Sequence, residues 1–125
     1  MNWRRHLLWI DCSAGAAVGT LVLILHGWLS NLYALPVGFV LFMGLANVAY
    51  ACGSFSLAVR RQRHLAGVQA LAIANMAWGA FLIGMTVVFA REASAFGLAT
   101  LVAEAVFVGG LGAVEWRHRH GLLTA

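Results

Sequence analysis

Arginine is confined almost entirely to three places in this 125-residue chain, and long apolar runs separate those places. Seven of the eight basic residues lie there: Arg4, Arg5, Arg60, Arg61, Arg63, Arg117 and Arg119. The eighth, Arg91, is followed directly by Glu92. Arginines in short loops stay on the cytoplasmic side when a chain inserts into a membrane. The pattern therefore predicts four membrane-spanning helices, with both termini and the middle loop in the cytoplasm.

Each of the four apolar runs is long enough to cross a bilayer, which takes about 20 residues as a helix. We predict an all-α polytopic membrane protein, an antiparallel bundle of four transmembrane helices over residues 7–29, 35–59, 65–90 and 95–116. Pro36 is expected in the first turn of the second helix, where its missing N–H has no helical partner. Residues 1–125 are expected to form one domain, since the first run is too long for a cleaved signal peptide.

The composition suits a lipid bilayer better than water. Apolar residues make up 62% of the sequence and charged residues 10%, whereas soluble domains are about 25% charged. The net charge of +4 suits anionic lipid headgroups, because nearly all the arginines flank the apolar runs at their cytoplasmic ends. Membrane lipids are thus expected partners, and nucleic acid is not. The absence of lysine hints at a bacterial origin, so we expect a multi-pass protein of the bacterial inner membrane.

Several polar side chains fall at a similar depth inside the predicted bundle. Counting about 1.5 Å per residue from the cytoplasmic end of each helix puts them roughly 15–20 Å into the membrane. They are Thr20, Asn47, Asn75, Trp78 and Glu104. A charge at the bilayer centre costs about 2.5–3.5 kcal/mol on insertion scales, so each such group needs a partner or a purpose. This layer is the candidate ligand- or ion-binding site.

Helical spacing predicts that these residues converge. Tyr50 follows Asn47 by three residues and Trp78 follows Asn75 by three, so each pair shares one helix face. Glu104 is then a carboxyl group in a small polar pocket, where burial favours the neutral acid. Such an acid can satisfy two amides as hydrogen-bond glue between helices, or it can bind and release a proton or cation. Both roles remain open.

A second polar cluster is predicted nearer the cytoplasmic side. Its members are Asp11, Ser54, Gln69 and Glu115. Glu115 and Arg119 have the i, i+4 order that favours an ion pair on a helix surface, and Arg4 and Arg5 are within reach of these carboxylates. Interfacial salt bridges are the first interpretation. A cytoplasmic gate or ion-uptake site is the second.

No pattern in the sequence is typical of an enzyme or of a cofactor site. There is no nucleophile with a matching base, no phosphate-binding glycine loop and no metal-ligand spacing. Cys12 and Cys52 have similar predicted depths, but a disulfide is disfavoured on the reducing side of a membrane. Haem ligation in a bundle takes paired imidazoles, and His26 alone lies within an apolar run. We expect no catalysis, no cofactor and no metal.

The order of these features resembles small bacterial four-helix integral membrane proteins to which no activity is assigned. The shared features span the chain: Asp11, Leu35 with Pro36, Asn75, Trp78, Glu104, and Glu115 with Trp116. The resemblance implies fold and location only. Chain length is also similar to that of small multidrug transporters and small fluoride channels. Those transporters have an acidic residue deep in the first helix, however, and both families often pair antiparallel, which a single orientation disfavours.

Two functions are compatible with this pattern. The first is a non-catalytic membrane module that binds a partner membrane protein, or a lipid-like small molecule, through the polar central layer. Small residues at four-residue spacing, such as Gly15 and Gly19, suit close helix packing, either within one bundle or in a parallel homo-oligomer. The second is a small proton- or cation-coupled transporter or channel that uses Glu104. We prefer the first function, because a single central acid with no ion pathway evident in the sequence gives little support for transport.

Overall fold

A computed structural model describes the backbone of residues 3–60 and 62–123, and the side chains of these residues from His6 onward. All regular structure in the described residues is helical. The elements are α1 (Trp3–Ile24), α2 (His26–Tyr33), α3 (Val37–Ala58), α4 (Leu65–Val88), α5 (Ala95–Arg117) and a short 3-10 turn, η1 (Gly121–Leu123). Four of these helices, α1, α3, α4 and α5, are long and apolar enough to cross a membrane. The all-α class with four long apolar helices is thus confirmed.

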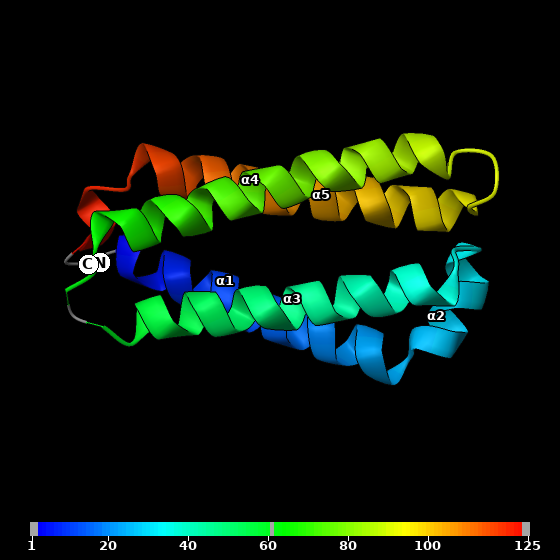
Figure 1. Ribbon diagram of the computed structural model, residues 1–125, viewed down its shortest axis with the longest axis horizontal. Helices are drawn as coiled ribbons and strands as arrows, with labels where there is room; N and C mark the ends of the chain where they lie inside the picture. The colour runs from blue at the N-terminus through cyan, green and yellow to red at the C-terminus, as the bar shows by residue number, and fades with distance from the viewer. Residues whose placement is uncertain (1–2, 61, 124–125) are drawn as a thin grey trace.

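The four long helices lie side by side along the molecule in two pairs (Figure 1). α1 packs mainly along α3, and α4 packs mainly along α5. α3 and α4 contact each other much less, although they are consecutive in the chain. The start of α1, the α3–α4 connection and η1 lie at one end, which we name the η1 end (Figure 1). α2 and the α4–α5 connection lie at the other, the α2 end, so successive long helices alternate in direction.

The first apolar run folds as two helices and not as one helix through residue 29. α1 ends at Ile24 and α2 begins at His26. The His26 Nδ1 lies 2.7 Å from the carbonyl oxygen of Leu23, which in a continuous helix would accept from the N–H of Gly27. A side chain that takes a helical acceptor in this way breaks the ladder and bends the chain. α2 consequently turns aside and contacts α3 and α5.

A tight turn joins α2 to α3. Ala34 ends α2 in a left-handed conformation with φ of 53°, and the Ser30 hydroxyl donates to the Leu35 carbonyl at 2.6 Å. Pro36 precedes α3 with an extended ψ of 137°, and its carbonyl accepts from the Val40 N–H at 3.1 Å. Pro36 is therefore the capping residue of α3, one position before the first helical turn in which it was predicted.

The start of α5 is tied to the end of α2. The Ser94 hydroxyl caps α5 by accepting from the Gly97 N–H at 3.0 Å, as serine often does at this position. The same hydroxyl donates to the Leu32 carbonyl at 2.8 Å, and the Ser94 N–H donates to the Tyr33 carbonyl at 2.9 Å. A Cβ on Gly97 would lie only 2.5 Å from that Tyr33 oxygen. These contacts join the two helix pairs at the α2 end.

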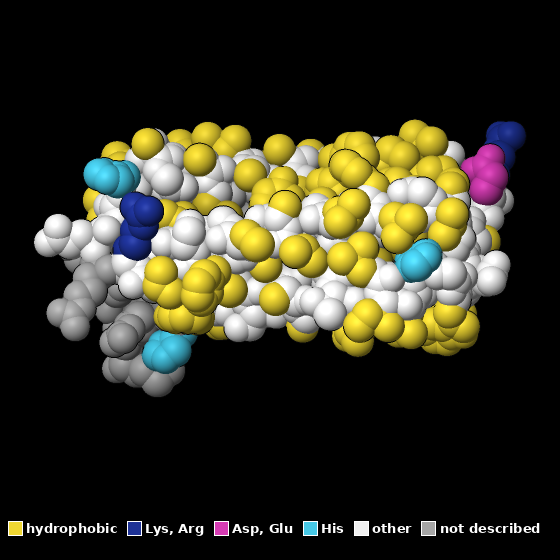
Figure 2. All heavy atoms as spheres, turned by 60° about the horizontal axis from the view of Figure 1, so that its bottom comes forward, with side chains coloured by type: hydrophobic (Ala, Val, Ile, Leu, Met, Phe, Trp, Pro, Cys, Tyr) yellow, Lys and Arg dark blue, Asp and Glu magenta, His cyan; other side chains and the backbone are white. Residues whose placement is uncertain are grey.

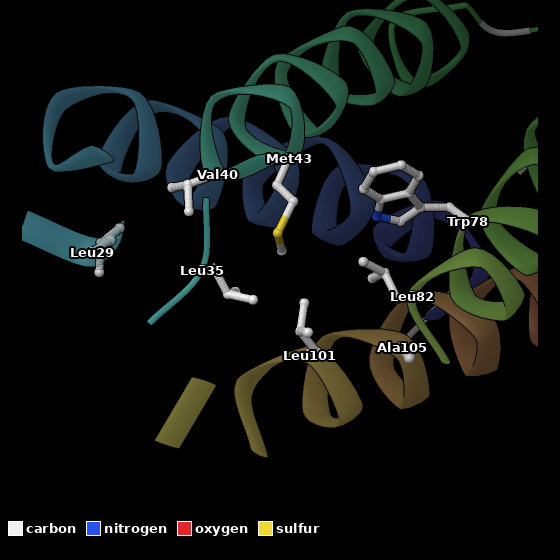
Figure 3. Packing of buried hydrophobic residues seen from close by; sticks show 8 residues of the cluster. All are labelled: Leu29, Leu35, Val40, Met43, Trp78, Leu82, Leu101 and Ala105. Atoms are coloured by element: carbon white, nitrogen blue, oxygen red, sulfur yellow. The ribbon is translucent and has the colours of Figure 1, made fainter. Parts of the chain in front are cut away.

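Apolar side chains fill the space between the helices toward the α2 end. Eight buried residues form this apolar cluster: Leu29, Leu35, Val40, Met43, Trp78, Leu82, Leu101 and Ala105. The side chains of Met43, Leu82 and Leu101 point toward one another between the two helix pairs (Figure 3). Leu82 and Leu101 are completely buried. The cluster packs the space between the helices on the α2 side of the middle of the molecule.

A smaller apolar group and a buried arginine lie at the η1 end. Leu7, Val68 and Leu122 pack together there. Arg63 is only 6% exposed, and its guanidinium donates to the carbonyl oxygens of Ala58 at 3.1 Å and Leu122 at 2.8 Å. Arg63 therefore joins the end of α3 to the η1 turn, a structural role that its place in the charge pattern did not predict.

Apolar side chains also cover much of the outside of the long helices. Leu21, Leu45, Val87 and Val106 are among the large residues exposed there. On the face drawn in Figure 2, apolar side chains run along the length of the molecule, and charged side chains and histidines lie toward its ends. Soluble monomers rarely expose so large an apolar surface. This outer surface is suited to contact with lipid.

Candidate functional site

A small cavity with both apolar and polar side chains in its wall lies between the two helix pairs near the middle of the molecule, and we name it the central cavity. All four long helices line it, through Asp11 of α1, Asn47 of α3, Asn75 and Trp78 of α4, and Glu104 of α5. Its volume is about 50 Å³. A water molecule takes up about 30 Å³ in the liquid, whereas drug-sized ligands fill about 300–1,000 Å³. The cavity thus suits one or two waters or a small ion, and not a lipid-like molecule.

Asn47 and Glu104 form a hydrogen-bonded pair beside this cavity. The Asn47 Nδ2 donates to Glu104 Oε1 at 2.9 Å and to the Met43 carbonyl of its own helix at 2.9 Å. An amide nitrogen has two hydrogens, so both are used. The bond to Met43 holds the amide in place, and Asn47 is 7% exposed. This hydrogen bond joins α3 of one helix pair to α5 of the other.

The indole of Trp78 forms one wall of the central cavity. Its ring stacks on Phe81, with centroids 5.1 Å apart, and packs against Phe42 and Tyr50. The Nε1–H faces the Glu104 carboxyl. Among the residues that the structure describes, however, none has the geometry of a hydrogen-bond acceptor for this buried nitrogen. A separation of this kind is one that a water molecule can bridge.

Asn75 holds two carboxyl groups on the η1 side of the cavity. Its Nδ2 donates to Asp11 Oδ2 at 2.9 Å and to Glu115 Oε1 at 2.7 Å. Asp11 is 6% exposed and Glu115 is completely buried. The two carboxyl groups are close enough to interact with each other electrostatically. We name Asp11 and Glu115 the carboxyl pair, and Asn75 is the amide that binds both.

Glycines allow the helices to approach closely enough for these contacts. A Cβ on Gly79 of α4 would lie 2.9 Å from the Ala105 carbonyl oxygen. On α5, a Cβ at Gly112 would lie 2.7 Å from the Ala72 carbonyl oxygen and 2.9 Å from the Cβ of Asn75. Real Cβ atoms essentially never come this close to backbone atoms. The short α4–α5 separation that lets Asn75 reach Glu115 thus depends on glycine.

The structure divides the predicted central layer into two hydrogen-bonded groups. Asn47 binds Glu104, but Asn75 binds Asp11 and Glu115, which were predicted in the cytoplasmic-side cluster. The direction of the side chains explains the difference. Side chains on a helix lean toward its N-terminus, which is at the η1 end for α4 and at the α2 end for α5. Asn75 therefore leans toward the η1 end, and Glu115 leans toward the middle.

The remaining predicted site residues lie outside these two groups. Tyr50 lines the central cavity, and its hydroxyl donates to the Ala74 carbonyl at 3.1 Å. Thr20 is exposed on α1. Ser54 is completely buried, and no described residue is a hydrogen-bond partner of its hydroxyl. Gln69 is half-buried and is not among the hydrogen-bond partners described for the carboxyl pair.

Glu115 does not form the predicted ion pair with Arg119. The Arg119 guanidinium donates to the Trp116 carbonyl at 2.8 Å and lies 4.5 Å from the centroid of the Trp116 ring. The prediction is wrong because Glu115 faces inward to Asn75, while a long arginine side chain reaches for the polar end of a helix. The side chains of Arg4 and Arg5 lie outside the described residues.

Within the described part of the chain, no three His, Cys, Asp or Glu side chains are grouped so that they could hold a metal ion. Cys12 and Cys52 are free thiols on α1 and α3, the two helices of one pair. Cys52 is exposed and Cys12 is half-buried. The carboxyl and amide groups around the central cavity are therefore the chemistry that this fold brings together.

The fold and the cavity define a class: a small all-helical chain with four helices able to cross a membrane and a polar cavity between them. Comparison with protein-family models, with curated proteins and with solved structures finds no match for this chain. Its function is therefore inferred from the cavity and from the contacts around it.

Proposed function

We propose that the protein is a four-helix bundle in the bacterial inner membrane, with both termini and the α3–α4 connection in the cytoplasm. Arg60 follows α3 and Arg117 ends α5, both at the η1 end, whereas Arg91 lies in the connection at the α2 end. Short segments rich in arginine stay on the cytoplasmic side. The η1 end is then cytoplasmic, and the central cavity lies within the bilayer.

In this membrane the protein acts as a small proton- or cation-coupled transporter or channel that uses Glu104. One observation carries this proposal: Asp11 and Glu104 line the same cavity, which has room for water or a small ion. Carboxyl groups inside a membrane are costly and commonly mark ion pathways. The cavity joins Glu104 to Asp11 on its η1 side, a connection that the sequence did not predict. This connection favours transport over a packing module.

The second candidate is a non-catalytic module that binds another membrane protein. Two open grooves of about 350 and 400 Å³ run between α3 and α4, with small residues such as Ala49, Gly53 and Ala70 in their walls. Small residues allow a neighbouring transmembrane helix to approach closely. A lipid-like ligand inside the bundle is not favoured, because the central cavity is about 50 Å³. A packing module would carry no ion flux.

Flux measurements on purified protein in liposomes distinguish the two candidates. With a pH-sensitive or a sodium-sensitive dye inside the vesicles and an imposed membrane potential, we expect the wild type to carry a cation flux. Glu104→Gln should lower this flux to that of protein-free vesicles. Glutamine keeps the size of the side chain and an oxygen for the Asn47 hydrogen bond, but it cannot bind and release the ion.

Glu92→Gln is the matched control, since it also removes one carboxylate. Glu92 is exposed in the connection at the α2 end, so this variant should keep the wild-type flux. A wild type without flux, or a Glu104→Gln protein with full flux, would contradict transport through Glu104.

A further inference from the structure

We propose that the transported ion is a proton, that Asp11 and Glu115 form its cytoplasmic uptake site, and that water in the central cavity passes it to Glu104. This inference rests on the proposed function and adds the identity of the ion and a second site. Two observations support it: the atoms that face each carboxyl group, and the position of the central cavity between the carboxyl pair and Glu104.

The groups that face Glu104 are hydrogen-bond donors, which suit a carboxyl oxygen and not a metal cation. Asn47 presents its amide N–H, 2.9 Å from Oε1, and Trp78 presents its indole N–H. A metal cation of the hard type needs about six oxygen ligands, whereas the carboxylates that line this cavity are those of Asp11 and Glu104. Such donors favour the carboxylate form, which leaves Glu104 able to accept a proton. The ion that this arrangement accepts is therefore a proton.

The same argument applies to the carboxyl pair. Asn75 turns both of its amide hydrogens to it, one toward Asp11 and one toward Glu115. Two ionised carboxylates side by side and away from water repel each other strongly, and one shared proton removes that repulsion. Glu115 Oε2 is completely buried, and no described residue is its hydrogen-bond partner. This oxygen is the position where the shared proton, or a water that delivers it, is held.

Ionisable side chains of α1 and α5 interact with each other at the pair. α1 supplies Asp11 and the neighbouring Cys12, which interacts with Asp11 electrostatically. α5 supplies Glu115, and α4 supplies the uncharged Asn75. Among these described groups, the amide of Asn75 carries no charge, and a proton taken up from the cytoplasm lowers the negative charge of the pair.

The central cavity connects the pair to Glu104. Asp11 lines the cavity from α1 and Glu104 lines it from α5, with Asn75 and Trp78 between them on α4. The free indole N–H of Trp78 gives a water molecule an anchor beside Glu104. A proton that leaves the pair is passed along this water to the Glu104 carboxylate, which becomes the neutral acid. The pair, left with two negative charges, takes up another proton from the η1 end and returns to one negative charge. Glu104 becomes a carboxylate again when its proton leaves toward the α2 end.

The test uses the liposome assay with four proteins: the wild type, Glu104→Gln, Glu115→Gln and Asp11→Asn. Each amide resembles the protonated acid and keeps an oxygen for Asn75, so folding should be retained. We expect proton flux in the wild type that is unchanged when a large organic cation replaces sodium. Both Glu115→Gln and Asp11→Asn should reduce proton flux about tenfold or more, since a positioned proton-transfer group typically contributes that much.

Glu115→Asp keeps a carboxyl group and should restore most of the flux that Glu115→Gln loses, which a purely structural role would not predict. Full proton flux in both Asp11→Asn and Glu115→Gln, beside an inactive Glu104→Gln, would overturn the uptake site and leave the proposed function standing. A flux carried by sodium would overturn the assignment of the ion. Full flux in Glu104→Gln would overturn the proposed function itself.

Discussion

Replacing Asn75 with leucine is expected to destabilise the protein by about 3 kcal/mol, in the range for breaking a buried polar network by removing one partner. Asn75 donates to Asp11 and to Glu115, and both carboxyl groups are buried. Leucine fills a similar volume but leaves the two acids facing each other without a donor. The unfolding of the purified protein in detergent, followed by heat or by a denaturing detergent, measures the loss.

The explanation can be separated from a simple packing defect. Replacing Asp11, Asn75 and Glu115 together with leucine also removes the two buried carboxyl groups that have lost their donor. The triple variant should recover much of the stability that Asn75→Leu loses, because replacing a whole buried ionic network with apolar residues is often neutral or stabilising. Asn31→Leu is the control, because Asn31 is exposed on α2 and should change stability little. An Asn75→Leu protein as stable as the wild type would show that the hydrogen bonds of Asn75 do not hold the carboxyl pair.

Gly112→Ala is the second large effect that we expect. The new Cβ would lie 2.7 Å from the Ala72 carbonyl oxygen and 2.9 Å from Asn75 Cβ, so α5 must move away from α4. Overpacking of this kind costs about 2 kcal/mol, and here it also separates Asn75 from Glu115. The same unfolding assay measures the effect, and the proton flux should fall with it.

Gly110→Ala is the matched control on the same helix, two residues away. No atom lies within 4 Å of a Cβ built on Gly110, so the substitution meets open space. Alanine favours a helix over glycine by up to about 1 kcal/mol, so this variant should be neutral or slightly more stable. Equal losses in the two variants would mean that the α4–α5 separation does not depend on Gly112.

The long helices were predictable because the apolar runs are long and the arginines lie between them. Three of the four predicted spans differ from the observed α3, α4 and α5 by two residues or fewer at either end. The first span differs because a histidine can bond to a carbonyl of its own helix. In a hydropathy profile His26 is one more residue of the apolar run. The profile does not predict the hydrogen bond between its ring and the Leu23 carbonyl.

The candidate site was predictable in part. The spacing and depth of residues along straight helices predicted that Asn47 lies near Glu104 and that Asp11 lies near Glu115. They did not predict that Asn75 belongs with the carboxyl pair, since that depends on the direction in which each side chain leans. Spacing and depth also did not predict that α1 pairs with α3 and α4 with α5. This pairing follows from the detailed fit of glycines such as Gly112 against neighbouring carbonyl groups.

The central claim is that Glu104 holds a proton that exchanges with water inside the membrane, and infrared spectroscopy of the reconstituted protein tests it most directly. We predict a carbonyl stretching band of a neutral carboxylic acid that shifts in heavy water, disappears in Glu104→Gln and persists in Glu92→Gln. If no band depends on Glu104, or if that band does not shift in heavy water, the proposed proton pathway is contradicted.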